Sequence, residues 1–183
     1  MVTSNLSLRK LFLRSFIYGL LTCIIALLIR QSLLTDEIRY TSNWTFFLLL
    51  LILSFGAFVY FRKFSANFTS IGQLFQASII FGIAVGIAFG LFYYINVTIV
   101  DTDYLQKALD TYYKTWADKG YSKEAIAAQV ELTDTFQNPI RWSLVLTQFH
   151  FLLTTGLAFI AGCITHKSLL AKWAELQFIK LNK

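Results

Sequence analysis

The chain has 183 residues, of which 56% are hydrophobic and only 14% are charged. Soluble domains carry about 45–50% apolar and about 25% charged residues, so this composition argues against a soluble globular domain and against disorder. The formal net charge of +6 does not indicate nucleic-acid binding, because the basic residues lie beside long apolar runs, where membrane topology already explains them.

Two apolar runs near the start of the chain are long enough to cross a bilayer as helices, which takes about 20 mostly apolar residues. The first predicts a span over about residues 11–31, with Arg14 and Arg30 toward its ends. A basic start before a short apolar core also resembles a signal peptide, but no A-x-A-like cleavage site follows it. The second predicts a span over about residues 44–61, with aromatic residues at both ends, as is typical of membrane interfaces.

A third span is expected over about residues 74–100, and glycines recur within it every four residues. Gly82, Gly86 and Gly90 therefore share one helix face. In lipid, small residues at this spacing let a second helix approach closely. We expect these glycines to be helix-packing residues, with the partner helix in the same chain or, as the less favoured alternative, in another chain.

Residues 101–141 are more polar, with seven acidic and five basic residues. Aromatic and apolar residues recur at helical spacing up to Trp116, Gly120 indicates a stop, and Ser122 can start a second helix. Asn138-Pro139 would end that helix or turn the chain. The pattern predicts a helical hairpin outside the bilayer.

The first helix of this hairpin carries a stripe of residues that is a candidate surface for binding a partner. The stripe consists of Tyr104, Leu105, Tyr112, Tyr113 and Trp116. Aromatic side chains often dominate protein interfaces. The alternative, which we favour, is that the stripe packs against the membrane or the second helix of the hairpin.

A fourth span is expected over about residues 142–165, and a basic amphipathic tail over residues 166–183. The tail alternates lysines with large apolar residues, a pattern suited to an anionic membrane surface. Gln148 and His150 are polar residues within the fourth span and form a possible intramembrane polar site, although they point to different sides of a helix. A packed histidine that hydrogen-bonds to another helix is the favoured alternative.

Charge on alternate sides of the four expected spans indicates the orientation. The N-terminus, residues 62–73 and the tail hold nine basic residues and one acidic residue. The opposite side holds seven basic and nine acidic residues. By the positive-inside rule both termini should be cytoplasmic, and the helical hairpin extracytoplasmic.

No catalytic constellation emerges from the sequence. The chain has no Gly-rich phosphate loop and no HExxH motif, and Cys23 and Cys163 lack metal-binding spacing. Both cysteines lie in apolar runs and are expected to be buried free thiols. We therefore expect no catalytic residues, no metal and no cofactor.

Several motifs, in their order and spacing, resemble the bacterial membrane family known as domain of unknown function 4199. They are Ser70-Ile71-Gly72-Gln73-Leu74-Phe75 before the Gly-rich span, Asp101-Thr102-Asp103-Tyr104, the segment from Gly120 to Ala128, and Phe136-Gln137-Asn138-Pro139. The family often has an acidic residue where Gln73 and Gln148 stand here, and a proline near Thr155. These departures count against a role that needs a carboxylate in the membrane. The resemblance implies four spans and no established activity.

The sequence thus predicts an all-α integral membrane protein that forms a single membrane domain over residues 1–183. It would have four transmembrane helices, an extracytoplasmic helical hairpin between the third and fourth helices, and a basic amphipathic tail. We expect a location in the bacterial inner membrane, with both termini cytoplasmic.

Function is predicted less sharply. The leading hypothesis is a non-catalytic accessory or scaffold subunit that binds another membrane or envelope protein, for example a glycosyltransferase acting on lipid-linked sugars. Self-association is an alternative to such a partner. The rival hypothesis is a small transporter or channel with a polar site near His150. A membrane enzyme is the third and least favoured.

Overall fold

The computed structural model describes residues 4–33, 44–64, 70–128 and 138–165, together with Ala171, Ala174, Glu175 and Phe178. Over these residues the chain is helical and contains no strand, which confirms the predicted all-helical fold for this part of the chain. The second half of the expected hairpin, from residue 129, and most of the expected amphipathic tail lie outside the described residues.

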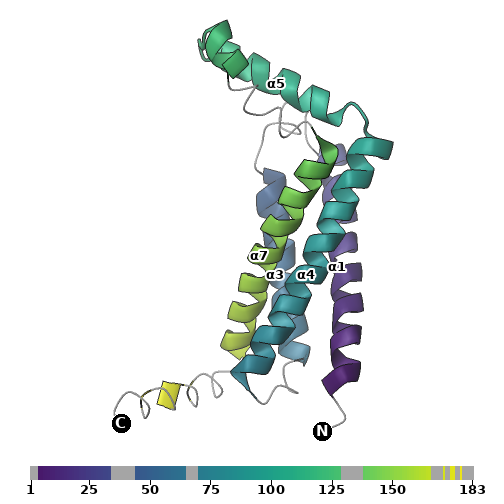
Figure 1. Ribbon diagram of the computed structural model, residues 1–183, viewed down its shortest axis with the longest axis vertical. Helices are drawn as coiled ribbons and strands as arrows, with labels where there is room; N and C mark the ends of the chain where they lie inside the picture. Colours follow the sequence, from purple (N-terminus) through teal and green to yellow (C-terminus); the bar gives the residue numbers. More distant parts are fainter. Residues whose placement is uncertain are drawn as a thin grey trace.

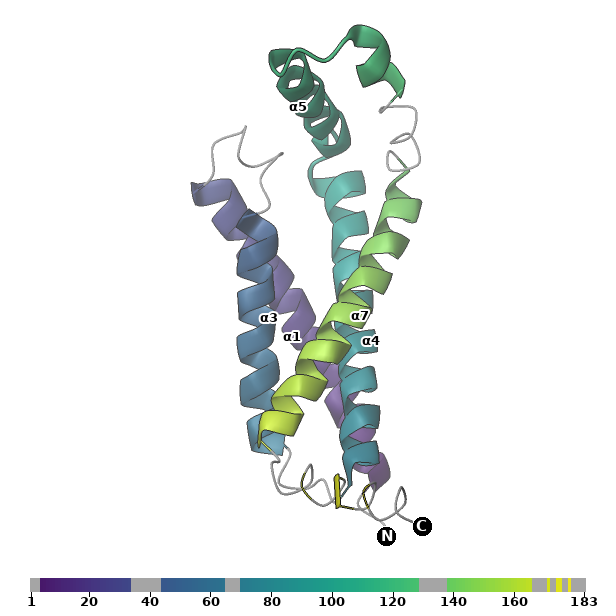
Figure 2. The ribbon, with the colours of Figure 1, turned by 90° about the vertical axis from the view of Figure 1, so that its left-hand side faces the viewer.

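Four long helices lie side by side in a bundle (Figures 1 and 2). They are α1 (Ser4–Leu33), α3 (Trp44–Phe64), α4 (Ile71–Ile95) and α7 (Pro139–Thr165). A π-helical turn, η2 (Asn96–Val100), extends α4. Helix α5 (Tyr104–Asp118) then crosses one end of the bundle, while the start of α1 and the end of α7 lie at the opposite end (Figure 1).

Three of the described helical stretches are long and apolar enough to cross a membrane: Leu8–Ile29, Ile71–Val100 and Pro139–Thr165. Helix α3 contains a shorter apolar stretch, Leu48–Tyr60. The described parts of the chain therefore have the length and hydrophobicity of a membrane protein.

Helix α4 is the most enclosed of the apolar helices, because it packs against both α1 and α7. Its buried residues Leu74, Phe81 and Val85 form the core together with Leu11 of α1 and Leu53 of α3. Lipid tails are as apolar as these side chains, so burial in lipid gains little from the hydrophobic effect. Close van der Waals packing between the helices is then the main stabilising term.

Polar residues mark the starts of α4 and α7. The hydroxyl of Ser70 accepts a hydrogen bond from the Gln73 backbone N–H at 3.3 Å and caps α4. The Asn138 side chain accepts bonds from the backbone N–H groups of Ile140 and Arg141, at 3.0 and 3.3 Å.

Pro139 is consequently the first residue of α7, where its missing N–H costs nothing. The fourth apolar helix begins three residues before the expected start at residue 142. The dipeptide Asn138-Pro139 was interpreted as a stop or turn, and in the structure it starts a helix.

Candidate functional site

Helix α5 carries the aromatic stripe and lies across the end of the bundle (Figures 1 and 2). Tyr112 and Tyr113 are exposed, whereas Tyr104, Leu105 and Trp116 are half-buried. The rings of Tyr112 and Trp116 are one helical turn apart, with centroids 6.0 Å apart and a tilted geometry. The stripe therefore does not form one continuous surface. Tyr104 faces the bundle, and only Tyr112, Tyr113 and Trp116, toward the end of α5, lie together on a surface away from it.

The near end of α5 is attached to the bundle through an aromatic joint, which consists of Tyr93, Tyr104 and Trp142. The Tyr93 ring meets Tyr104 of α5 edge-on at a centroid distance of 6.2 Å, and Trp142 of α7 at 6.4 Å. Lys107 also lies 3.5 Å from the Asp101 carboxylate, which is a partly exposed ion pair. One ring of α4 thus fixes the start of α5 relative to α7.

Beyond α5 the chain turns at Gly120, whose φ of +80° favours glycine. Residues 123–128 are helical again. The Ser122 hydroxyl accepts a hydrogen bond from the Ala125 backbone N–H at 3.2 Å, so Ser122 acts as an N-cap. Ile126 is buried at 5% exposure. The residues expected to continue this helix, including Val130 and Phe136, lie outside the described residues.

The three glycines of α4 face α7 of the same chain. A Cβ atom on Gly86 would lie 2.7 Å from the Thr147 carbonyl oxygen, and one on Gly82 would lie 2.7 Å from that of Phe151. A Cβ on Gly90 would lie 3.0 Å from the Ser143 carbonyl oxygen. The backbones of α4 and α7 therefore meet at a separation that only glycine permits at these positions.

The structure does not bring Gln148 and His150 together. Gln148 is exposed on the outside of α7, whereas His150 points inward and is 5% exposed. The His150 ring lies over Phe89 of α4 at a centroid distance of 3.9 Å. Its Nδ1 atom is buried and has no hydrogen-bond partner among the described residues. The hydroxyl oxygen of Thr155, also on α7, is likewise buried without a hydrogen-bond partner among the described residues.

Several other buried polar groups in the bundle bond within their own helices. The hydroxyls of Thr22, Ser78 and Thr154 each donate to the carbonyl oxygen four residues earlier, at 2.6–2.9 Å. Asn96, at the start of the π-helical turn, is buried, and its Oδ1 atom has no partner within the described part of the chain. Cys23 is buried and Cys163 partly so, and both are free thiols.

Residues 14–166 match the family described as Protein of unknown function (DUF4199). The chain belongs to this family. The matched region of this DUF4199 protein includes α3, α4, α5 and α7 and most of α1, and thus both the aromatic joint and the glycine contact. No curated protein and no solved structure matches the DUF4199 chain.

Sequence reasoning found the stripe on α5 but not the joint that holds it. Tyr93 was interpreted only as part of an apolar span, and Trp142 only as the start of the next span. Tyr93 and Trp142 are aromatic residues at the end of one expected span and the start of another, and that position was the available signal.

Proposed function

We propose that the protein crosses the membrane four times and acts as a non-catalytic accessory subunit that binds another membrane or envelope protein through α5. The observation that carries this proposal is the position of α5. It lies outside the four-helix bundle, held at one end by the aromatic joint, with Tyr112 and Tyr113 exposed at the other.

Four spans are supported by the length of α3 as well as by the three longer apolar stretches. Its 21 residues would extend about 31 Å at 1.5 Å per residue, close to the hydrocarbon thickness of a bilayer. Leu51 and Phe55 on this helix are exposed, as suits contact with lipid.

The orientation that we propose has both termini in the cytoplasm of a bacterium and α5 outside the inner membrane. The surplus of basic residues on the side of the termini supports it. On this account α5 would be available to a partner with a domain outside the membrane.

Exposed tyrosines favour an interaction surface because they bury large areas and lose little side-chain entropy on binding. Gln106, Asp110 and Lys114 are exposed on α5 among its aromatic residues, and Gln106 donates a hydrogen bond to Asp110 at 2.8 Å. An apolar centre with a polar rim is the usual anatomy of a protein interface.

A transporter is the second candidate, and the buried Nδ1 atom of His150 is the observation that favours it. A polar path needs several groups that can exchange partners with a substrate. Here the hydroxyls of Thr22, Ser78 and Thr154 donate within their own helices. On α7 only His150 Nδ1 and the Thr155 hydroxyl are buried without a hydrogen-bond partner among the described residues, which is few for such a path. The accessory role therefore fits the interior better.

Affinity purification of the tagged chain from native membranes, followed by mass spectrometry, tests the proposal. The expected result is a second membrane or envelope protein in a fixed ratio to the chain. A glycosyltransferase acting on lipid-linked sugars is the partner class to examine first. Recovery of the chain alone, together with solute flux into liposomes containing only this chain, would instead support the transporter.

A further inference from the structure

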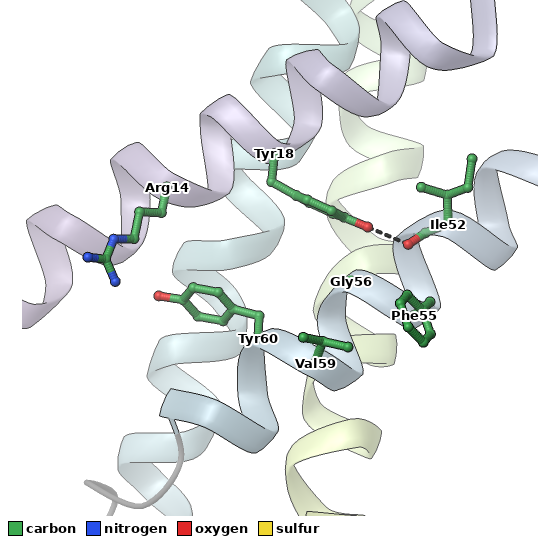
Figure 3. Close-up of a pocket in the computed structure, with 7 residues that line it drawn as sticks. All are labelled: Arg14, Tyr18, Ile52, Phe55, Gly56, Val59 and Tyr60. Atoms are coloured by element: carbon green, nitrogen blue, oxygen red, sulfur yellow. Dashed lines mark hydrogen bonds between the residues drawn. The ribbon is translucent and has the colours of Figure 1, made fainter.

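A groove of about 680 Å³ lies between α1 and α3 (Figure 3). Tyr18 of α1 lines it, and the Tyr18 hydroxyl donates a hydrogen bond to the Ile52 carbonyl oxygen of α3. The Tyr18 ring crosses directly over Gly56, where any Cβ atom would overlap it. The two helices are thus bridged at this point, and an apolar channel remains beside the bridge.

The wall of the groove on α3 is apolar and open. Phe55 is 71% exposed and Val59 is 46% exposed, and both line the groove. The volume lies within the roughly 300–1,000 Å³ typical of small-molecule sites. An acyl chain matches such a surface because it is narrow, flexible and apolar.

One end of the groove is cationic. Arg14 of α1 is exposed there, opposite Tyr60 of α3, and Figure 3 shows the Arg14 guanidinium and the Tyr60 hydroxyl at the same end of the groove. Arg14 lies inside the apolar stretch Leu8–Ile29, about 9 Å from its start at 1.5 Å per residue. The long Arg14 side chain can extend back from that depth toward Arg9 and Lys10, and so toward the lipid headgroups.

The sequence offers Arg14 no nearby carboxylate. None of the four long helices contains an aspartate or glutamate. On the side of the chain termini the single acidic residue is Glu175, against nine basic ones. A guanidinium within an apolar stretch is costly unless an anion pairs with it. The charge partner of Arg14 is therefore best supplied from outside the chain.

We infer that this groove binds an anionic glycerophospholipid, with its phosphate at Arg14 and Tyr60 and an acyl chain along Phe55 and Val59. Guanidinium binds phosphate through two parallel hydrogen bonds, and the tyrosine hydroxyl can donate a third. The site would take a lipid from the leaflet on the side of the chain termini. It does not depend on α5 or on a protein partner.

Native mass spectrometry of the purified chain with phosphatidylglycerol, and separately with phosphatidylcholine, tests this inference. We expect retention of one phosphatidylglycerol at roughly tenfold lower concentration than phosphatidylcholine. Arg14→Gln should abolish the preference, whereas Arg9→Gln, an exposed arginine on the same helix outside the groove, should leave it unchanged. Equal retention of the two lipids by the unaltered chain would overturn the inference.

Two further outcomes would also overturn it. An equal loss of preference in Arg9→Gln and Arg14→Gln would indicate general surface attraction, and a dimer that excludes lipid would show that a second copy fills the groove. If Arg14→Gln fails to fold, Tyr60→Phe decides the matter, because it removes only a hydroxyl. We expect it to weaken phosphatidylglycerol retention about threefold, and unchanged retention would count against the site.

Discussion

The ring of Tyr93, near the end of α4, meets the ring of Tyr104, at the start of α5, at an interplanar angle of 89°. This edge-to-face contact spans the irregular link between the two helices, which includes the π-helical turn Asn96–Val100. Such pairs contribute about 0.5–1.5 kcal/mol beyond the area they bury. Because Tyr93 also contacts Trp142, the contact ties the direction of α5 to both α4 and α7.

The aromatic joint predicts that Tyr93→Leu loosens α5 without unfolding the bundle. Backbone amides in α5 should exchange with deuterium faster, because Tyr104 at the start of the helix loses its contact with the Tyr93 ring, which also links it to Trp142. Tyr94→Leu is the matched control, since Tyr94 is the next residue and is 39% exposed. Equal protection of α5 in the two variants would show that the joint does not hold the helix.

The glycine contact predicts opposite effects for two Gly→Ala changes. Gly86→Ala should destabilise the chain by about 1–3 kcal/mol, because the new Cβ forces α4 away from the Thr147 carbonyl of α7. A Cβ on Gly156 meets nothing within 4 Å, so Gly156→Ala should be neutral or stabilise by up to about 1 kcal/mol. Unfolding in detergent at increasing denaturant measures both. A Gly86→Ala protein as stable as the Gly156→Ala protein would rule out the close contact.

The helix over residues 123–128 should depend on pH through Glu124. Hydrogen bonds from its own backbone N–H and from the Ser122 hydroxyl hold the pKa of this exposed carboxyl below its ordinary value. A lowered folded-state pKa means that charged Glu124 stabilises the helix above the ordinary carboxyl pKa, of about 4.3. This contribution is lost as the pH falls through the lowered value.

Carbon-detected NMR shifts of residues 123–128 between about pH 3 and pH 6 would follow this loss. We expect helical shifts to weaken at the acid end in the unaltered chain. Glu124→Gln should remove the pH dependence, because it keeps the side-chain shape but does not titrate. A transition of the same size in Glu124→Gln would assign the change to another group.

The proposed orientation predicts which cysteines an impermeant thiol reagent can reach. In a background lacking Cys23 and Cys163, a cysteine replacing Ser122 should react from outside intact spheroplasts. Both Ser122 and Arg9 are exposed. Ser122 follows α5, which crosses one end of the bundle, and Arg9 belongs to the start of α1, at the opposite end (Figure 1). A cysteine replacing Arg9 should react only after the membrane is opened, and the reverse order would invert the topology.

The sequence predicted structure best where a residue type allows only one local geometry, as a regular glycine spacing does on a helix. The spacing of Gly82, Gly86 and Gly90 defined a helix face, although sequence alone left open whether its partner lay in the same chain, and the structure places α7 there. Hydrophobicity located the four apolar helices, although α1 begins at Ser4, seven residues before the expected span. It missed the start of α7, because Pro139 can follow a turn or begin a helix and only the bonds to Asn138 distinguish the two.

Contacts between side chains of distant segments could not be predicted from the sequence. The sequence placed Arg14 toward one end of the first expected span, but it gave no sign of the groove that Arg14 shares with α3. No sequence pattern links Tyr18 to Gly56, because the two residues are in contact only where α1 and α3 cross. The separation of Gln148 from His150, in contrast, follows from helical periodicity alone.

The most direct test of the accessory role compares partner capture by two variants at equal abundance in native membranes. Trp116→Ala removes a half-buried ring next to Tyr112 and should lower the yield of co-purified partner about tenfold, if Trp116 anchors the interface as aromatic hot spots do. His150→Gln keeps a hydrogen-bonding side chain and should leave the yield within about twofold. Tyr121→Ala, an exposed residue beyond α5, controls for general loss of aromatic surface. When the variants have equal helicity and equal stability in detergent, we expect only Trp116→Ala to lose the partner. Full capture by Trp116→Ala, or loss of the partner in His150→Gln alone, would contradict the accessory role.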